Sequence, residues 1–197
     1  GPLGGKARME GKGILFKRFA DVDVFDIEID CKTVDEIVAA VKVLEPTFGG
    51  INLEDIKAPE CFEVEAQLRE IMDIPVFHDD QHGTAIIATA AFINAIELTE
   101  RDISKTKVVF SGAGAAAMAI ANLFFKVGIK PENLIMCDSK GVIHTERKEG
   151  MNKYKEKFSI NTKLRTIADA MDGADAFMGC SARGVISKEM VKTMAKD

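Results

Sequence analysis

The fold of this 197-residue chain is decided by the stretch Val108-Val109-Phe110-Ser111-Gly112-Ala113-Gly114-Ala115-Ala116-Ala117. Residues typical of a buried strand lead into a GxGxxA turn, and an apolar helical pattern follows. Gly112 permits the tight turn, Gly114 lets backbone N–H groups approach a pyrophosphate, and Ala117 lets the helix pack closely on the strand. The stretch therefore predicts a strand–turn–helix unit that binds a dinucleotide, although such a turn also occurs without a ligand.

The next predicted strand, Leu134 to Cys137, leads to Asp138. An acidic residue about 20 positions beyond the turn commonly binds the adenosine ribose. Asp138 favours the free 2′-hydroxyl of NAD, whereas Lys140 lies close enough to pair with the 2′-phosphate of NADP, so both cofactors stay open. The predicted cofactor-binding residues are Gly112, Ala113, Gly114, Ala115, Ala116 and Asp138.

Strand and helix patterns alternate through the second half of the chain. This alternation around a glycine turn predicts an α/β fold with a Rossmann-like, doubly wound and mostly parallel sheet. The predicted elements are a helix over 115–127, a small extra strand over 142–144, a helix over 163–171, a strand over 176–179 and a helix over 187–195.

The first half also alternates between strands and helices. Strands are predicted over 13–19 and 22–29, the second because apolar and acidic residues alternate along it. Thr33 and Glu36 have capping-box spacing, which predicts a helix that begins directly after Thr33. A strand over 51–56, a helix over 60–72 and a strand over 75–77 complete this half.

The most apolar run extends from Gly83 to Leu98 and contains one charged residue, Glu97. It is too short and too rich in Ala and Thr for a membrane span. We expect a helix that begins at Gly83-Thr84 and is buried on most sides in the domain core. A subunit interface is the alternative.

Composition narrows the class of protein. The chain is 47% hydrophobic and 29% charged, with a net charge of −5. This mild acidity argues against a nucleic-acid-binding surface, and no membrane segment is expected. Four scattered cysteines without a CxxC pair indicate reduced thiols in a cytoplasmic protein.

Acidic residues follow two of the predicted strands. Glu54 and Asp55 end one strand, and Asp79 and Asp80 end the next. Adjacent strand residues point to opposite faces, so Glu54 and Asp55 reach one ion only if the strand ends or turns there. With Asp80 they offer three hard oxygen ligands, which suit Mg²⁺ or Mn²⁺. The alternative is that Glu54 and Asp55 are solvated loop acids.

Two other groups near these acids carry chemistry. His78 and His82 would share a face in a helix and hold zinc or iron, but Gly83-Thr84 is typical of a helix start, so ordinary hydrogen bonding is the favoured role. Lys12 stands between two glycines before a predicted strand. Beside acids, it is a candidate for proton transfer.

Together these motifs resemble the malic enzyme family in its shorter bacterial-type form. The resemblance covers essentially the whole chain, and its acidic motifs are more specific than the glycine turn. The matching segments, in family order, are Met9-Glu10-Gly11-Lys12, Phe48-Gly49-Gly50-Ile51-Asn52-Leu53-Glu54-Asp55, Phe77-His78-Asp79-Asp80-Gln81-His82-Gly83-Thr84-Ala85 and Gly112-Ala113-Gly114-Ala115-Ala116.

The resemblance implies oxidative decarboxylation of (S)-malate to pyruvate and CO₂ with reduction of NAD or NADP. It implies that Lys12 is the general base, that Asp79 pairs with Lys12, and that Glu54, Asp55 and Asp80 hold Mg²⁺ or Mn²⁺. It also implies a homodimer or higher oligomer. Residues 1–83 would be the C-terminal part of the malic-enzyme N-terminal α/β domain, and residues 84–197 a Rossmann-like NAD(P)-binding domain truncated at its C-terminus.

The chain departs from the family pattern in three places. The family's tyrosine acid is expected upstream of Lys12, whereas Tyr154 lies in the other domain. Two family asparagines are expected beyond Asp197, and the strand expected after Val191-Lys192-Thr193-Met194 is missing. We therefore expect an incomplete, weakly active or inactive piece of a longer enzyme. The alternatives are a metal-independent dehydrogenase of another hydroxy or amino acid, and a nucleotide-binding regulatory fragment.

Overall fold

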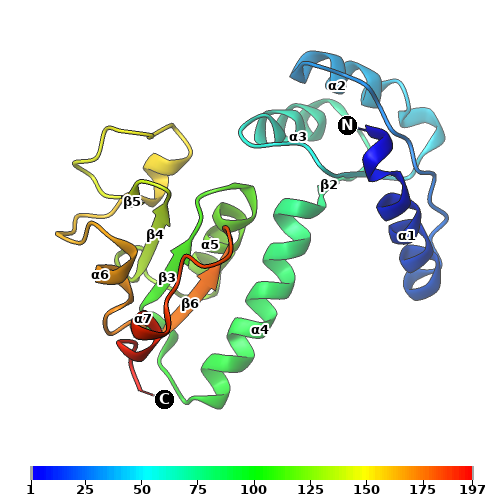
Figure 1. The fold of residues 1–197 in the computed structure, drawn as a ribbon. Coiled ribbons are helices and arrows are strands. Elements are labelled where there is room, and N and C mark those ends of the chain that lie inside the picture. The colour runs from blue at the N-terminus through cyan, green and yellow to red at the C-terminus, as the bar shows by residue number, and fades with distance from the viewer. Residues whose placement is uncertain (1, 197) are drawn as a thin grey trace. The chain divides into compact units, whose positions relative to one another are not determined.

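A computed structural model describes residues 2–196, with side chains from residue 4 onward. The chain divides into two compact units, Gly1–Phe77 and His78–Asp197 (Figure 1).

The first unit is built around two packed helices and a short strand. α2 (Val34–Lys42) begins at the predicted capping box, in which Thr33 and Glu36 exchange hydrogen bonds, and it packs against α3 (Glu60–Ile71). β1 (Ile51–Leu53) is a neighbour of β2 (Val76–His78) in a two-stranded sheet. The core comprises Val38, Val41, Leu53, Val64, Leu68 and Met72.

The two predicted N-terminal strands are wrong. Residues 13–19 belong to a long helix, α1 (Pro2–Ala20), whose last turn carries Lys17 and Arg18, where the helix dipole favours cations. The helix ends at Ala20, and the next residue, Asp21, has a φ of 53°, which no helix continues. The side chains of residues 13–19 suit either a strand or a helix, and among residues 2–196 no strand pairs with this segment to form a sheet.

The segment 22–29 carries no strand either, and lies against α1 instead. Its acidic residues pair with lysines of the helix: Lys6 Nζ lies 3.0 Å from Asp26 and 3.2 Å from Glu28, and Lys17 Nζ lies 3.0 Å from Asp23. The acidic residues of this segment therefore pair with lysines of α1 rather than line the solvent-facing side of a sheet.

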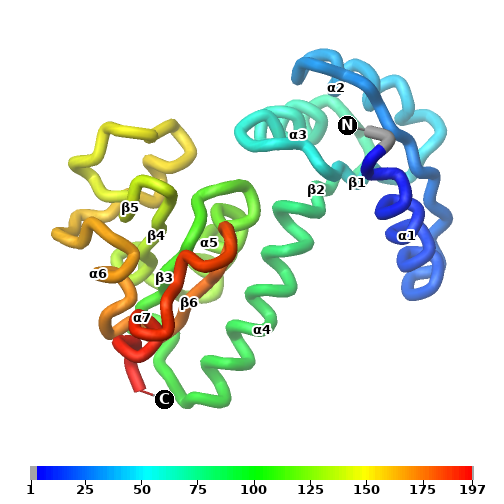
Figure 2. Tube along the Cα trace, viewed as in Figure 1, coloured from blue at the N-terminus to red at the C-terminus, as the bar shows by residue number. Residues whose placement is uncertain are grey.

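The second unit contains the predicted doubly wound sheet. Its strands are β3 (Val108–Ser111), β4 (Leu134–Asp138), β5 (Gly141–Val142) and β6 (Ala176–Gly179), in the order β5-β4-β3-β6. β3 runs parallel to both β4 and β6, and β5 is an antiparallel edge. The chain trace in Figure 2 follows these crossovers. The α/β, Rossmann-like fold class is confirmed.

Helices cover both faces of this sheet (Figure 1). On one face α5 (Ala115–Val127) packs against α4 (Thr84–Leu98), where the Phe92 and Phe124 rings stack with centroids 4.2 Å apart. On the other face Val109, Ile135 and Cys137 pack with α6 (Ile167–Met171) and with Met190 of α7 (Lys188–Lys192). Alternate strand residues therefore serve opposite layers.

One expectation for α4 is confirmed and one is wrong. The α-helix begins at Thr84 with Gly83 as its N-cap, as predicted, and a π-helical turn, Asp79–Gly83, precedes it directly. Only Ala85, Thr89 and Phe92 of α4 are buried, whereas Ile87 is 72% exposed and Leu98 is 84% exposed. One stripe of the helix packs on α5, and its other apolar residues remain on the surface of this chain.

Smaller elements lie near their predicted places. The extra strand is β5, one residue earlier than expected, and α6 begins at Ile167 because Thr166 and Asp169 form a capping box. None of the four cysteines forms a disulfide, and Cys61 and Cys137 are buried. Among residues 2–196, no helix combines the length and the apolar character needed to cross a membrane.

Candidate functional site

The glycine turn between β3 and α5 has the geometry that the sequence predicts. Gly112 has a φ of +120°, and a Cβ there would stand 2.5 Å from the carbonyl oxygen of Cys180. Its N–H donates to Cys137 O at 2.7 Å, which joins the turn to β4. Gly112 is therefore required by both its backbone angle and its packing.

The beginning of α5 lies open to an anion. Gly114 is the N-cap, no side chain caps the first turn, and no heavy atom lies within 4 Å of the place of a Cβ on Gly114. Helix-start N–H groups without a side-chain acceptor favour a phosphate. Ala113, Ala115 and Ala116 keep side chains small here, and Ala117, in the first turn of α5, is fully buried.

Asp138 ends β4 and is held by two cations that the sequence did not predict. Arg147 Nη2 donates to both of its oxygens at 2.8 Å, and Lys155 Nζ donates to Oδ2 at 2.6 Å. Burial alone would raise the pKa of Asp138, but hydrogen bonds from Lys155, the Lys140 amide and Arg147 outweigh it and lower that pKa. Asp138 is therefore an ionised carboxylate with a net positive surrounding.

Lys140 contacts Asp138 through its backbone and not through its side chain. Its backbone N–H donates to Asp138 Oδ1 at 2.9 Å, whereas its side chain pairs with Glu149 at 2.6 Å. Its ammonium is thus engaged with Glu149, and Lys155 and Arg147 supply the positive charge beside Asp138.

The carboxylates of the first unit follow β1 directly. β1 ends at Leu53 and Asp55 has a φ of 57°, so the chain turns at this pair, as a shared ion requires. Glu54 pairs with Lys12, and Asp55 pairs with Arg8. The Glu54 side chain is only 8% exposed, and that of Asp55 is 48% exposed.

Lys12 stands in the middle of α1 rather than at the start of a strand. Its side chain is 22% exposed, and its ammonium reaches the Glu54 carboxylate. The structure thus brings a predicted proton-transfer residue to a predicted metal ligand within one unit.

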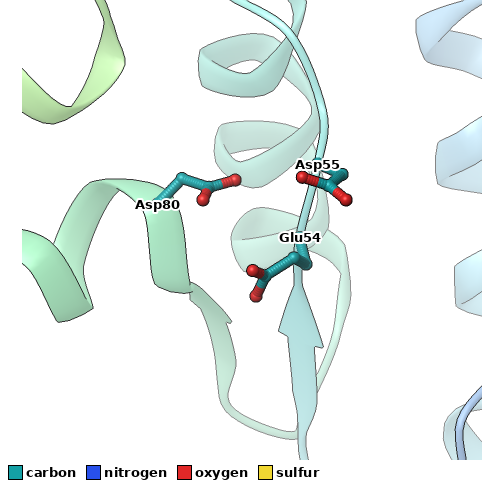
Figure 3. A group of neighbouring side chains, drawn as sticks. All are labelled: Glu54, Asp55 and Asp80. Carbon is teal, nitrogen blue, oxygen red and sulfur yellow. The ribbon is translucent and has the colours of Figure 1, made fainter. Parts of the chain in front are cut away.

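Asp79 and Asp80 lie in the π-helical turn that follows β2. The Asp79 carboxylate lies over Gly83, where a Cβ would collide with it, so the glycine of this motif makes room for the acid. Figure 3 draws the three predicted metal ligands: Glu54 and Asp55 directly after β1, and Asp80 in the turn after β2. His78 is buried at the end of β2, and His82 lies within the turn.

Three functional candidates escaped prediction from the sequence: Arg8, Arg147 and Lys155. Arg8 lies one turn before Lys12, a spacing that would have placed both on one helix face if α1 had been predicted as a helix. Arg147 and Lys155 reach Asp138 through the irregular loop after β5, for which the sequence offers no periodic signal.

Comparisons with known proteins agree with this arrangement. Residues 1–69 match the family model of the malic enzyme N-terminal domain, and residues 81–197 match that of the malic enzyme NAD binding domain.

Two curated relatives and one solved structure illustrate the similarity. The chain is 58% identical to an NADP-dependent malic enzyme of Rhizobium meliloti over 194 residues, which cover 98% of the chain and 26% of that protein. It is 55% identical to an NAD-dependent malic enzyme of the same organism, in an alignment that covers 100% of the chain and 26% of that protein. The crystal structure of an NAD-dependent malic enzyme from Thermotoga maritima superposes with a TM-score of 0.93 at 42% identity. The superposition covers 100% of this chain and 53% of that one.

The chain thus spans about a quarter of the length of the first two relatives. The two family models together cover most of its residues; the glycine turn and Glu54-Asp55 lie within them, whereas Asp79 and Asp80 lie in the short gap between the two matches. The chain belongs to the malic enzyme family.

Proposed function

We propose that this chain carries the metal-binding and nicotinamide-binding core of an enzyme that oxidatively decarboxylates (S)-malate to pyruvate and CO₂ while it reduces NAD(P)⁺. The observation that carries the proposal is the Lys12–Glu54 ion pair, since it joins a candidate base to a candidate metal ligand. The names of the relatives and the glycine turn of the second unit support it.

The candidate ligands fit a hard divalent cation. Glu54, Asp55 and Asp80 each offer one carboxylate oxygen, a donor set that suits Mg²⁺ or Mn²⁺ better than zinc or iron. Such a cation, when bound, supplies Lewis-acid stabilisation of negative charge that develops on substrate oxygen. The turn at Asp55 supports the proposal, because it frees adjacent acids from opposite faces of a strand.

Lys12 would have to lose its ammonium proton first, and as the neutral amine it would take the proton of the malate C2 hydroxyl as hydride leaves C2 for the nicotinamide. The resulting 2-keto acid loses CO₂ by cleavage of the bond between C3 and the departing carboxylate, and C3 then receives a proton. Asp79 would position Lys12, as the family resemblance implies. These reaction steps balance in atoms and electrons, because the reduced cofactor holds the two electrons removed from C2.

The surroundings of Asp138 favour NADP over NAD. An acid that binds the ribose 2′-hydroxyl of NAD needs an acceptor oxygen that is available. Here both oxygens already accept from cations, and Arg147 and Lys155 together exceed the single negative charge of Asp138. A 2′-phosphate would supply the missing negative charge, with Lys155, 18% exposed, as its contact.

The proposal includes a cytoplasmic location and a homo-oligomeric assembly. Free cysteines support a cytoplasmic location. The exposed apolar residues Ile87 and Leu98 of α4 support a homodimer or higher oligomer, in which such side chains become covered.

A second candidate is a metal-independent dehydrogenase of another hydroxy or amino acid. The observation that favours it is that Arg8 and Lys12 already neutralise Asp55 and Glu54. In that case the acids hold α1 in place and bind no cation.

Isothermal titration of the 197-residue chain with Mn²⁺ and with NADP⁺ separates the two candidates. Metal-dependent malate oxidation predicts that Mn²⁺ binds and that Asp80→Asn and Glu54→Gln each weaken binding about tenfold or more, since each removes a charged ligand. NADP⁺ binding without Mn²⁺ binding would favour the second candidate. If both variants bind Mn²⁺ as tightly as the wild type, the assignment of Glu54 and Asp80 as ligands is refuted.

A further inference from the structure

Two cations on one face of α1 meet two acids at the end of β1. Arg8 and Lys12 are one helical turn apart, so both side chains project to the same side. Arg8 pairs with Asp55, and Lys12 pairs with Glu54. The helix therefore presents a two-rung ladder of ion pairs to the carboxylates that the proposed function assigns to a divalent cation.

The two rungs differ in burial. The inner pair is shielded, with Lys12 22% exposed and Glu54 8% exposed, whereas Arg8 is 59% exposed and Asp55 is 48% exposed. Exposed ion pairs contribute little free energy, because water and salt screen them. The outer pair is therefore the one that a divalent cation can displace readily.

We infer that Arg8 is a built-in competitor of the divalent cation for Asp55. This inference rests on the proposed metal site. A guanidinium on Asp55 occupies a ligand oxygen, and its positive charge repels a cation that approaches the same carboxylate. Binding of the cation and formation of the Arg8–Asp55 pair are then opposed, and each weakens the other by the same factor.

α1 keeps its place when Arg8 leaves Asp55, because other contacts anchor the helix. Lys6 pairs with Asp26 and Glu28 of the segment beside α1, and the side chain of Val24 packs where Gly13 leaves space, 3.6 Å from a Cβ placed there. A substitution at Arg8 therefore changes the charge beside Asp55 without removing the anchor of the helix.

The test is the affinity of the 197-residue chain for Mn²⁺, measured by isothermal titration at low salt. Arg8→Gln should bind Mn²⁺ about two- to fivefold more tightly than the wild type, the range expected from loss of an exposed ion pair. Arg8→Lys keeps the charge and should restore affinity close to that of the wild type. The gain should shrink at high ionic strength, because salt screens the competing charge.

Arg18→Gln is the matched control, because it removes an exposed arginine from the last turn of the same helix. An equal gain in this variant would show a general effect of net charge and overturn the inference. Unchanged or weaker Mn²⁺ binding by Arg8→Gln, with a melting temperature equal to that of the wild type, would also overturn it. Arg8→Met repeats the test if the glutamine variant unfolds.

The outcomes separate the inference from the proposed function. If the wild type binds Mn²⁺ and Arg8→Gln binds it equally well, the metal site stands and only the competition fails. If neither protein binds Mn²⁺ while both bind NADP⁺, the metal site itself fails and the competition fails with it.

Discussion

Arg147 holds Asp138 through a single nitrogen: Nη2 donates to both carboxylate oxygens at 2.8 Å, while Nη1 donates to Gly141 O at 3.1 Å. The Arg147 side chain is 6% exposed, so this pair is shielded from water. Arg147 thus neutralises the charge of Asp138, the acid at the proposed ribose position. The positive charge of Lys155, which also contacts Asp138, is left in excess. This relationship connects the loop after β5 to the choice of cofactor.

Lys155→Gln should lower the affinity for NADP⁺ about tenfold and leave the affinity for NAD⁺ nearly unchanged. The reason is the loss of a charged donor to the 2′-phosphate, since such hydrogen bonds contribute about 1.5–3 kcal/mol. Titration with 2′,5′-ADP and with 5′-AMP isolates this contact. Lys157→Gln, two residues along and exposed, is the control. An equal loss for both nucleotides would contradict the assignment of Lys155.

Asp138→Asn should destabilise the folded chain by about 2–3 kcal/mol at neutral pH, because it leaves the shielded Arg147 without its counter-charge. The pKa of Asp138 is lowered in the folded state, so the carboxylate stabilises the fold above its unfolded pKa of about 3.9. That contribution is lost as the pH falls through the lower, folded pKa. Urea unfolding at several pH values should show the two proteins converging in acid, and a constant difference would argue against this role.

Gly112→Ala and Gly114→Ala should have opposite consequences. At Gly112 a Cβ meets Cys180 O and the φ is +120°, so we expect a loss of about 2 kcal/mol or more in the free energy of unfolding. At Gly114 the space is open and φ is −94°, so stability should change by no more than about 1 kcal/mol. NADP⁺ affinity should nevertheless fall about tenfold, because a methyl group keeps the phosphates from the helix start. Tight binding by Gly114→Ala would refute a phosphate site there.

The sequence predicts the second unit well, because its signals are local. The turn at Gly112 and Gly114 and the buried strands each require only neighbouring residues, and each appears where expected. The first unit was less predictable. Residues 13–19 suit a strand or a helix, and the choice depends on whether a partner strand lies beside them.

The candidate site shows the same division. Glu54 and Asp55 were identifiable as acids that follow a strand, but their partners Lys12 and Arg8 come from a helix that the sequence pattern did not reveal. Asp138 was identifiable from its place after β4, whereas Arg147 and Lys155 reach it through a loop. Partners brought together by irregular chain have no periodicity to detect.

Two helical glycines should respond to alanine with opposite signs. At Gly83 a Cβ would collide with the Asp79 carboxylate, so Gly83→Ala should destabilise the chain by about 1–3 kcal/mol as that acid is displaced. Gly11 lies within α1 with nothing within 4 Å of a Cβ, so Gly11→Ala should stabilise it by about 0.5–1 kcal/mol. Denaturant unfolding of both variants measures the contrast. A Gly83→Ala protein as stable as the wild type would show that the Asp79 carboxylate is free to move, and the glycine would then have no steric role in this motif.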